Sequence, residues 1–301
     1  MGEGSYLKLP PGELAKRAAL ATAALADCAV CAQRCLVNRL EGETGICRSG
    51  RHAVVSSYGP HFGEEAPLVG TKGSGTIFFT HCNLSCRFCQ NCDISQHGEG
   101  DEVSAEELAG VMLNLQKRGC HNVNLVSPSH FAPQFLEALA AAAEKGLSIP
   151  VVYNTGGYDS LDTLDLLDGV IDVYMPDIKF GDDEAGRKYA GAAGYFTVAR
   201  EAVQKMHGQV GDLVLDERGV AARGLLVRHL VLPGDLARTE KVMEFLAEEV
   251  SRNTFINVMD QYHPAYRALN YPELSRRITR EEYREALKAA ERAGLTRIYT
   301  G

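Results

Sequence analysis

The stretch that decides the fold is Thr76–Cys92, which reads Thr-Ile-Phe-Phe-Thr-His-Cys-Asn-Leu-Ser-Cys-Arg-Phe-Cys-Gln-Asn-Cys. Its first five residues, Thr76–Thr80, form a short apolar run of the kind that predicts a buried strand. The loop that follows carries thiols at Cys82, Cys86 and Cys89. A buried strand that leads directly into metal-binding side chains predicts a functional site at the carboxyl end of that strand.

Similar apolar runs recur along the chain and alternate with helical patterns. Short apolar strands that alternate with helices are typical of βαβ units and a parallel sheet. Six such units predict an α/β fold, either a partial (βα)6 TIM-like barrel or a doubly wound sheet. The predicted strands are Thr76–Thr80, Asn122–Ser127, Ile149–Tyr153, Ile171–Met175, Leu225–Leu232 and Thr254–Met259. The predicted helices are 104–118, 131–145, 160–168, 194–207 and 236–250.

Two further segments flank this repeating pattern. The first combines an alanine-rich amphipathic helix, predicted at 12–27, with a small cysteine-rich stretch and a strand at Ala53–Tyr58. The second is a helix predicted at 280–293, with Thr279 as its N-cap and two glutamates in its first turn. The sequence therefore predicts an N-terminal helix and four-cysteine segment, a partial barrel and a C-terminal helix, at 1–70, 71–270 and 271–301.

The composition narrows the class of protein. The 301 residues include 31 basic and 39 acidic side chains, a formal net charge of −8, which argues against nucleic acid as a partner. No apolar run is long enough to span a membrane, and Met1–Pro11 lacks the apolar core of a secretory signal. We therefore expect a cytoplasmic protein without a membrane partner. Nine cysteines in such a protein indicate metal or redox chemistry better than disulfides.

The cysteines fall into groups with different expected roles. Three thiolates spaced C-x3-C-x2-C can ligate three irons of a 4Fe–4S cube and leave the fourth iron open for a cofactor. Cys92 offers a fourth thiol near this loop, so a zinc site or a closed cluster is the alternative. We expect Cys92 to be a bystander and Cys120, which precedes the second strand, to be a buried apolar filler.

The three-cysteine loop resembles the signature of the radical S-adenosylmethionine (SAM) superfamily, C-x3-C-x-aromatic-C, with Phe88 as the aromatic residue. The phrases at 62–65, 67–70 and 228–234 are similar to one branch, the pyruvate formate-lyase activating protein-like family, whose members carry a cysteine-rich N-terminal segment. The resemblance implies a 4Fe–4S cluster on Cys82, Cys86 and Cys89 and reductive cleavage of SAM to a 5′-deoxyadenosyl radical.

The same resemblance suggests partners and a substrate. A flavodoxin or ferredoxin would reduce the cluster, and the radical would abstract hydrogen from a glycyl-radical enzyme. Because about 70 residues precede the loop here, another protein or a small molecule stays open as the substrate. The rival hypothesis from another class is a non-catalytic iron–sulfur or zinc protein.

Resemblance to the activating enzymes also suggests residues that hold SAM. Asn154 and Thr155 resemble their ribose-side turn, Asp177 and Lys179 their Asp-x-Lys motif, and His229 belongs to an Arg-His pair. Asp177 is able to accept from ribose hydroxyls, while Lys179 and His229 are able to face a carboxylate. The alternatives are an ordinary ion pair between Asp177 and Lys179, and a core histidine at 229. No residue is assigned a catalytic role from the sequence.

One position departs from the superfamily pattern. Where a Gly-Gly-Glu turn usually receives the SAM amine, this chain reads Val-Ser-Pro-Ser-His at 126–130. Ser127 and Ser129 are therefore the candidates for this contact, together with backbone carbonyls.

The N-terminal group, Cys28, Cys31, Cys35 and Cys47, supplies four thiols with a glycine-rich turn before the last. Four thiolates can close a tetrahedral zinc site or an auxiliary iron–sulfur cluster. The sequence leaves both open. It favours zinc or a purely structural role, because nothing nearby in the sequence indicates an entry point for electrons.

Overall fold

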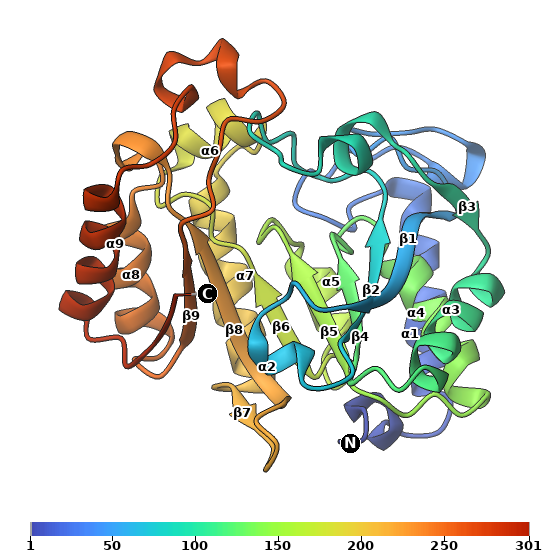
Figure 1. Cartoon of the computed structure of the whole chain (residues 1–301). Helices are drawn as coiled ribbons and strands as arrows, with labels where there is room; N and C mark the ends of the chain where they lie inside the picture. The colour runs from blue at the N-terminus through green and yellow to red at the C-terminus, as the bar shows by residue number, and fades with distance from the viewer. Residues whose placement is uncertain (1, 301) are drawn as a thin grey trace.

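The computed structural model describes residues 2–300 and shows an α/β fold with a sheet of ten strands (Figure 1). The strands are β1 Ala53–His61, β2 Ser74–Phe79, β3 Asp101–Val103, β4 Val123–Val126, β5 Val151–Thr155, β6 Val173–Pro176, β7 Val214–Leu215, β8 Ala221–Leu230, β9 Phe255–Met259 and β10 Arg297–Tyr299. Their order is β10-β9-β8-β6-β5-β4-β2-β1-β3, with β7 paired to β8. From β2 to β10 this row is parallel, while β1 is antiparallel to β2 and to β3.

Helices cover the outer face of the sheet and leave its inner face concave, which is the arrangement of a partial barrel (Figure 1). The helices are α1 Glu13–Ala23, α2 Ala66–Val69, α3 Ala105–Lys117, α4 Ala132–Glu144, α5 Leu161–Leu166, α6 Asp183–Ala190, α7 Tyr195–Val210, α8 Thr239–Phe245 and α9 Arg280–Ala293. The N-terminal α1 packs beside α4, so it joins the outer layer. The link from β1 to β2, which includes α2, crosses the concave face.

The predicted parallel row is confirmed, because the six predicted strands are β2, β4, β5, β6, β8 and β9 in that spatial order. The predicted last helix is α9, and its Thr279 N-cap forms a capping box with Glu282. The helix predicted from 236 begins only at Thr239, because Arg238 has a left-handed backbone with φ 52°. Strands β3, β7 and β10 have two or three residues each, too few for an alternation of apolar side chains to predict them.

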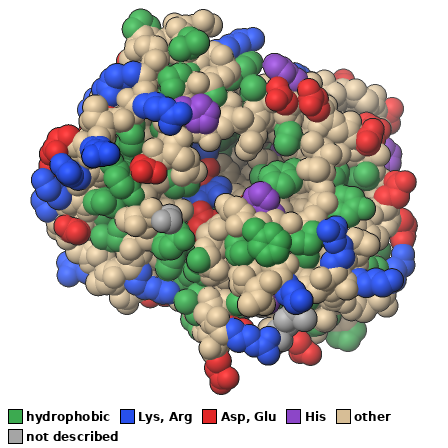
Figure 2. Space-filling view, in the orientation of Figure 1, with side chains coloured by type: hydrophobic (Ala, Val, Ile, Leu, Met, Phe, Trp, Pro, Cys, Tyr) green, Lys and Arg blue, Asp and Glu red, His purple; other side chains and the backbone are tan. Residues whose placement is uncertain are grey.

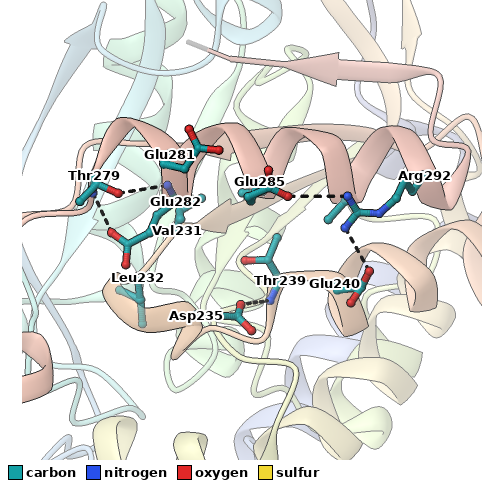
Figure 3. A pocket seen from close by; sticks show the side chains of 12 residues that line it. Val231, Leu232, Asp235, Thr239, Glu240, Thr279, Glu281, Glu282, Glu285 and Arg292 are labelled. Carbon is teal, nitrogen blue, oxygen red and sulfur yellow. Dashed lines mark hydrogen bonds and ion pairs between the residues drawn. The ribbon is translucent and has the colours of Figure 1, made fainter.

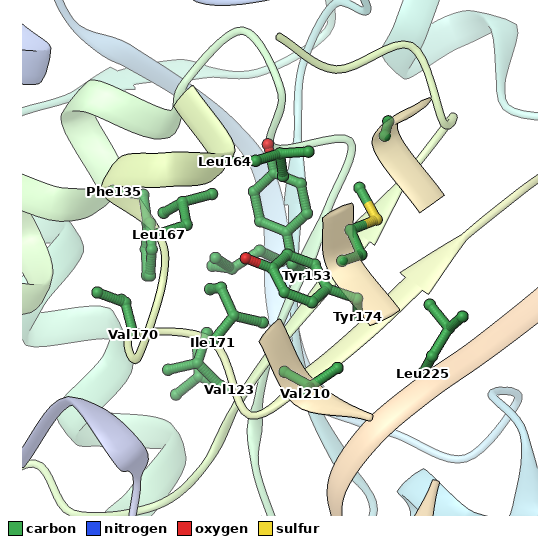
Figure 4. Packing of buried hydrophobic residues seen from close by; sticks show 14 of the residues in the cluster. Val123, Phe135, Tyr153, Leu164, Leu167, Val170, Ile171, Tyr174, Val210 and Leu225 are labelled. Atoms are coloured by element: carbon green, nitrogen blue, oxygen red, sulfur yellow. The ribbon is translucent and has the colours of Figure 1, made fainter. Parts of the chain in front are cut away.

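The core between sheet and helices is apolar, with two buried tyrosines near its centre (Figure 4). Tyr153 on β5 and Tyr174 on β6 are fully buried and meet edge to face, with ring centroids 5.8 Å apart. Each hydroxyl donates a hydrogen bond, Tyr153 to Asp159 and Tyr174 to Gln209. Buried hydroxyls with partners avoid the cost of unsatisfied polar groups, so these strands stay fixed where their carboxyl ends carry the site.

Within residues 2–300, no helix combines the length and apolar character needed to cross a membrane.

Candidate functional site

The three-cysteine loop follows β2 and lies at the carboxyl edge of the parallel sheet (Figure 1). Cys82, Cys86 and Cys89 line one cavity of about 150 Å³. Burial raises the pKa of Cys82 to about 11 and that of Cys86 to about 12. These thiols therefore keep their protons at neutral pH until a metal displaces them.

Phe88, the aromatic residue before Cys89, points into the protein rather than toward the cavity. Its ring packs against Phe180 and Tyr262, with centroid distances of 6.0 and 5.9 Å. The backbone N–H of Ser85 donates to the carbonyl of Ala190, 2.7 Å away at the end of α6. The aromatic residue thus anchors the loop, which explains why the spacing includes it.

A charged cluster lies opposite the loop, at the ends of β6 and β8. The Asp177 carboxylate accepts from Lys179 Nζ at 2.6 Å and from Arg228 Nε at 2.7 Å. Arg228 Nη2 also donates to Asn154 Oδ1 at 2.8 Å. Burial alone would raise the pKa of Asp177, but Arg228 and Lys179 outweigh it and lower that pKa to about 2. Asp177 is therefore a permanent anion that fixes two cations beside the cavity.

Two glutamates from the link between β1 and β2 reach the same cluster across the concave face. Glu64 and Glu65 lie 3.5 and 3.7 Å from Arg228 Nη1, and Asn257 donates to Glu65 Oε1 at 3.0 Å. Glu65 Oε2 is buried without a hydrogen-bond partner, so it is able to accept from a ligand. Both side chains are therefore part of the concave site and not of a solvated loop, since only 8% of Glu64 and 5% of Glu65 is exposed.

Glu64 predicts a pH dependence of stability. Burial, reinforced by Glu65, raises the pKa of Glu64 to about 7 despite the attraction of Arg228. Between its usual value and pH 7 the folded chain binds more protons than the unfolded chain, so the free energy of unfolding falls as pH rises. We expect Glu64→Gln to remove this fall and to be about 1–3 kcal/mol more stable than wild type at pH 8.

Urea unfolding at pH 4.5 and pH 8 measures this difference. Glu201→Gln, an exposed position on α7, is the matched control and should keep the wild-type slope. Equal pH slopes for wild type and Glu64→Gln would contradict the assignment.

The last two residues of β5, Asn154 and Thr155, lie at the cavity. Thr155 Oγ1 donates to the buried Asp159 carboxylate at 2.6 Å, which fixes its orientation. Gly157 follows with φ 76°, and a Cβ there would lie 2.6 Å from the carbonyl oxygen of Asp177. Only glycine suits this left-handed position against the neighbouring strand end.

The two serines proposed for the SAM amine are placed differently. Ser127 ends β4 with φ 58° and lines the cavity beside Cys82. Ser129 is buried, and its hydroxyl is 2.9 Å from Thr155 Oγ1. Ser127 therefore keeps its place as a candidate for direct contact, whereas Ser129 supports Thr155.

The prediction that His229 faces a carboxylate needs correction. His229 is fully buried; its Nδ1 lies 2.7 Å from the Ile178 carbonyl oxygen and its Nε2 lies 2.9 Å from Thr239 Oγ1. Burial lowers the pKa of His229 to about 4, so the ring is neutral. It is the core histidine of the alternative interpretation, because β8 alternates its side chains and turns Arg228 inward and His229 outward.

A second cavity, about 230 Å³, adjoins the loop on the side of β8 and β9 and includes Cys86 and Cys89 in its lining. Figure 2 shows the hollow on this face, with acidic and basic side chains gathered inside it. Its outer wall carries the side-chain amides of Gln90, Asn91 and Gln261. The site therefore has the loop thiols on one side, the charged cluster around Asp177 at its base, and the side-chain amides of Gln90, Asn91 and Gln261 at its opening.

The sequence matches the Radical SAM superfamily over residues 76–246. The chain belongs to the radical SAM superfamily. A similar protein of Methanocaldococcus jannaschii, itself uncharacterized, is 36% identical over 281 residues, which cover 91% of this chain and 77% of that protein.

A solved radical SAM structure shows the same fold at low sequence identity. A radical SAM methyltransferase from Sphaerobacter thermophilus has a TM-score of 0.52 and 13% identity over 75% of this chain and 65% of its own, so the chain spans less than two thirds of it. A domain of pyruvate-formate lyase-activating enzyme from Bacteroides vulgatus has a TM-score of 0.41 and 14% identity over 57% of this chain and 92% of its own.

Radical SAM membership implies a 4Fe–4S cluster and SAM, and the residues present fit both. The three loop thiols share one cavity with Ser127, Asn154 and the Asp177–Lys179 pair. Within residues 2–300, no group of three or more His, Cys, Asp or Glu side chains is arranged to hold a metal ion by itself. An inorganic cube supplies its own sulfides between the irons, so the thiols need only reach its corners.

The remaining cysteines of this region lie outside the cavity that the three loop thiols line. Cys92 Sγ lies 3.8 Å from Asp93 Oδ1 at the start of a short π-helix, outside the lining of both cavities. Cys120 is fully buried in the main core.

A larger cavity, about 490 Å³, lies between α8 and α9, away from this site (Figure 3). It is an acidic groove in which Arg292 pairs with Glu240 and Glu285, while Glu282 caps α9 at Thr279. None of the predicted site residues lines it. Size alone therefore does not identify the functional cavity here.

Proposed function

We propose that this protein reductively cleaves SAM at a 4Fe–4S cluster on Cys82, Cys86 and Cys89, and that the resulting radical removes hydrogen from a glycine in a partner protein. The observation that carries the first part is the shared cavity of the three thiols with the strand-end residues Asn154 and Asp177. When bound, cluster and SAM supply a one-electron cleavage that yields methionine and a 5′-deoxyadenosyl radical.

The residues of the chain orient the cofactor. The Lys179 ammonium would bind the SAM carboxylate. The Asp177 carboxylate would accept hydrogen bonds from the ribose hydroxyls while it keeps its ion pairs with Lys179 and Arg228. Arg228 donates hydrogen bonds to both Asp177 and Asn154, over 2.7 and 2.8 Å. Ser127 and the carbonyls of its turn accept from the amine.

The second cavity supports a peptide as substrate. Gln90, Asn91 and Gln261 present side-chain amides, which pair with backbone N–H and C=O groups without a charge on the substrate. Gln90 Nε2 donates to the Gln261 carbonyl at 3.2 Å. This hydrogen bond links the loop to the segment after β9 at the opening of the cavity. An extended segment with a glycine would thread beside Cys86 and Cys89, because glycine allows close approach of its Cα.

We also propose a reduced flavodoxin or ferredoxin as electron donor and the cytoplasm as compartment. All nine cysteines are free thiols, which suits a reducing environment.

The test uses protein reconstituted with iron and sulfide without oxygen, reduced with dithionite and given SAM. A glycyl-radical enzyme from the same source, grown on α-deuterated glycine, is the substrate. We expect 5′-deoxyadenosine that carries deuterium and a glycyl radical in the EPR spectrum. Unlabelled 5′-deoxyadenosine would contradict hydrogen abstraction from glycine but not SAM cleavage. A reaction without any 5′-deoxyadenosine would contradict the proposal that this protein cleaves SAM.

A further inference from the structure

The N-terminal cysteines surround one small cavity of their own, apart from the three-cysteine loop. Cys28, Cys31, Cys35 and Cys47 all line it, and all but Cys35 are buried. Burial raises the pKa of the Cys31 thiol, and the other three cysteines reinforce this rise, so the four sulfurs are close neighbours. Four soft ligands therefore gather around one point, and they keep their protons until a metal displaces them.

Two backbone N–H groups of this segment point at sulfur atoms. The N–H of Gln33 hydrogen-bonds to the Cys31 sulfur, and the N–H of Ile46 donates to Cys35 Sγ at 3.5 Å. A Cβ at Gly45 would lie 2.6 Å from Cys35 Sγ, so the turn needs glycine to make room for the sulfur. Hydrogen bonds of this kind favour a thiolate over a thiol, and they are typical of the outer shell around metal ligands.

The size of the cavity decides what the four sulfurs are able to enclose. Its volume is about 10 Å³, close to the least that holds one water molecule. A cube of four irons and four sulfides needs far more room than that. A zinc ion with four thiolates at about 2.3 Å needs no more than the space of one small ion. The lining therefore fits a single ion and excludes an iron–sulfur core.

The thiols have to move a little to close around an ion. Within residues 2–300, no group of three or more ligating side chains already has the arrangement of a metal site. Cys35 is the thiol with the most freedom to approach the others, because it is half-exposed and Gly45 beside it has no side chain. An ion would therefore draw the sulfurs inward by way of Cys35.

Charge and ligand chemistry favour a divalent ion that binds thiolates. Arg39 is fully buried, donates to the carbonyls of Gly50 and His130, and lies 3.9 Å from Cys28 Sγ. A buried cation suits any anionic centre, so Arg39 does not choose the metal. The ligands do, because zinc binds such a site more tightly than ferrous iron and accepts four thiolates in a tetrahedron.

We propose that Cys28, Cys31, Cys35 and Cys47 bind one zinc ion in a closed four-thiolate site. The sequence left zinc and an auxiliary cluster open, and the size of the cavity selects the single ion. With all four positions taken by thiolates the ion has no place for a substrate, so its role is structural. The inference does not rest on the proposed function.

The segment that the ion would fix braces two walls of the cavity at the three-cysteine loop. Gln33 Nε2 donates to the carbonyl of Asn83 in that loop at 2.7 Å. Cys31 forms an isolated β-bridge with Asp159, whose carboxylate accepts from Thr155 at the end of β5. In Figure 1 the blue N-terminal segment and the teal segment after β2 lie together over the carboxyl ends of the strands. The ion would thus hold the N-terminal segment against the loop and β5.

The first experiment measures metal content after the loop ligands are removed. The Cys82→Ser/Cys86→Ser/Cys89→Ser protein, purified without chelators from cells supplied with zinc and iron, should hold about one zinc per chain and no labile sulfide. Adding Cys28→Ser and Cys31→Ser should remove the zinc, whereas adding Cys92→Ser and Cys120→Ser should not. Iron with sulfide, a single iron without sulfide, or no metal in the triple variant would overturn the proposal.

The second experiment leaves the four proposed ligands intact, so it does not depend on the folding of their variants. Cys35 and Cys92 are both half-exposed, so a maleimide should reach both thiols unless one of them binds a metal. In the triple variant we expect labelling of Cys92 alone, and of Cys35 as well once a chelator has removed the zinc. Mass spectrometry of peptides reads both sites. Labelling of Cys35 before chelation, or its protection afterwards, would contradict the zinc site.

Discussion

Replacement of Cys82, Cys86 or Cys89 by serine should abolish the response to SAM completely. Each thiol lines the cavity shared with the strand-end residues, and an open cube needs all three thiolates. We expect no spectral change on addition of SAM and no 5′-deoxyadenosine above the background of protein-free solution.

Cys92→Ser is the matched control for this prediction. Its thiol is near the loop in sequence, but it contacts Asp93 and does not line either cavity at the loop. The variant should keep the SAM-induced EPR change and the wild-type yield of 5′-deoxyadenosine. A Cys92→Ser protein that fails to respond to SAM would make Cys92 a ligand and contradict the three-thiol assignment.

The features that the sequence predicts well depend on residues that lie close together in the chain. The strand at 76–80 and the loop thiols are adjacent in the chain, so apolar pattern and spacing are enough to place them. The same holds for α9, where Thr279 and Glu282 form the capping box within one turn. Each of these features is local, and the strand and the helix are confirmed.

The parts that escaped prediction depend on contacts far apart in the chain. Glu64 meets Arg228 across 164 positions, and Asn257 meets Glu65 across 192. The sequence shows charges at these positions but not that one strand turns Arg228 into the barrel. Successive side chains of a strand point to opposite faces of the sheet, so the sequence of β8 does predict that Arg228 and His229 face opposite ways.

Arg39 illustrates the same limit. Nothing in its neighbourhood in the sequence marks it as a buried cation. Its contact with the carbonyl of His130 spans 91 positions, and only the folded chain brings its guanidinium within 3.9 Å of Cys28 Sγ.

Arg228→Met should cause the largest loss of stability among single substitutions at the site. Arg228 pairs with the largely buried Asp177 and lies within 3.7 Å of the buried Glu65. Removing one partner of a buried ion pair typically costs about 3–5 kcal/mol, since the remaining charge has lost its compensation. Urea unfolding at pH 7 measures the free energy, and Arg228→Lys should lose clearly less because it keeps the charge.

A double-mutant cycle separates the ion pair from simple loss of packing. Asp177→Asn alone leaves Arg228 and Lys179 without their shared anion, so it too should destabilise the fold. If the pair is coupled, Arg228→Met/Asp177→Asn should be less destabilised than the sum of the two single variants, by about 1–3 kcal/mol. Strictly additive losses would show that Arg228 stabilises the barrel through its apolar stem. Arg228 would then not be the residue that fixes Asp177 in the position proposed for ribose binding.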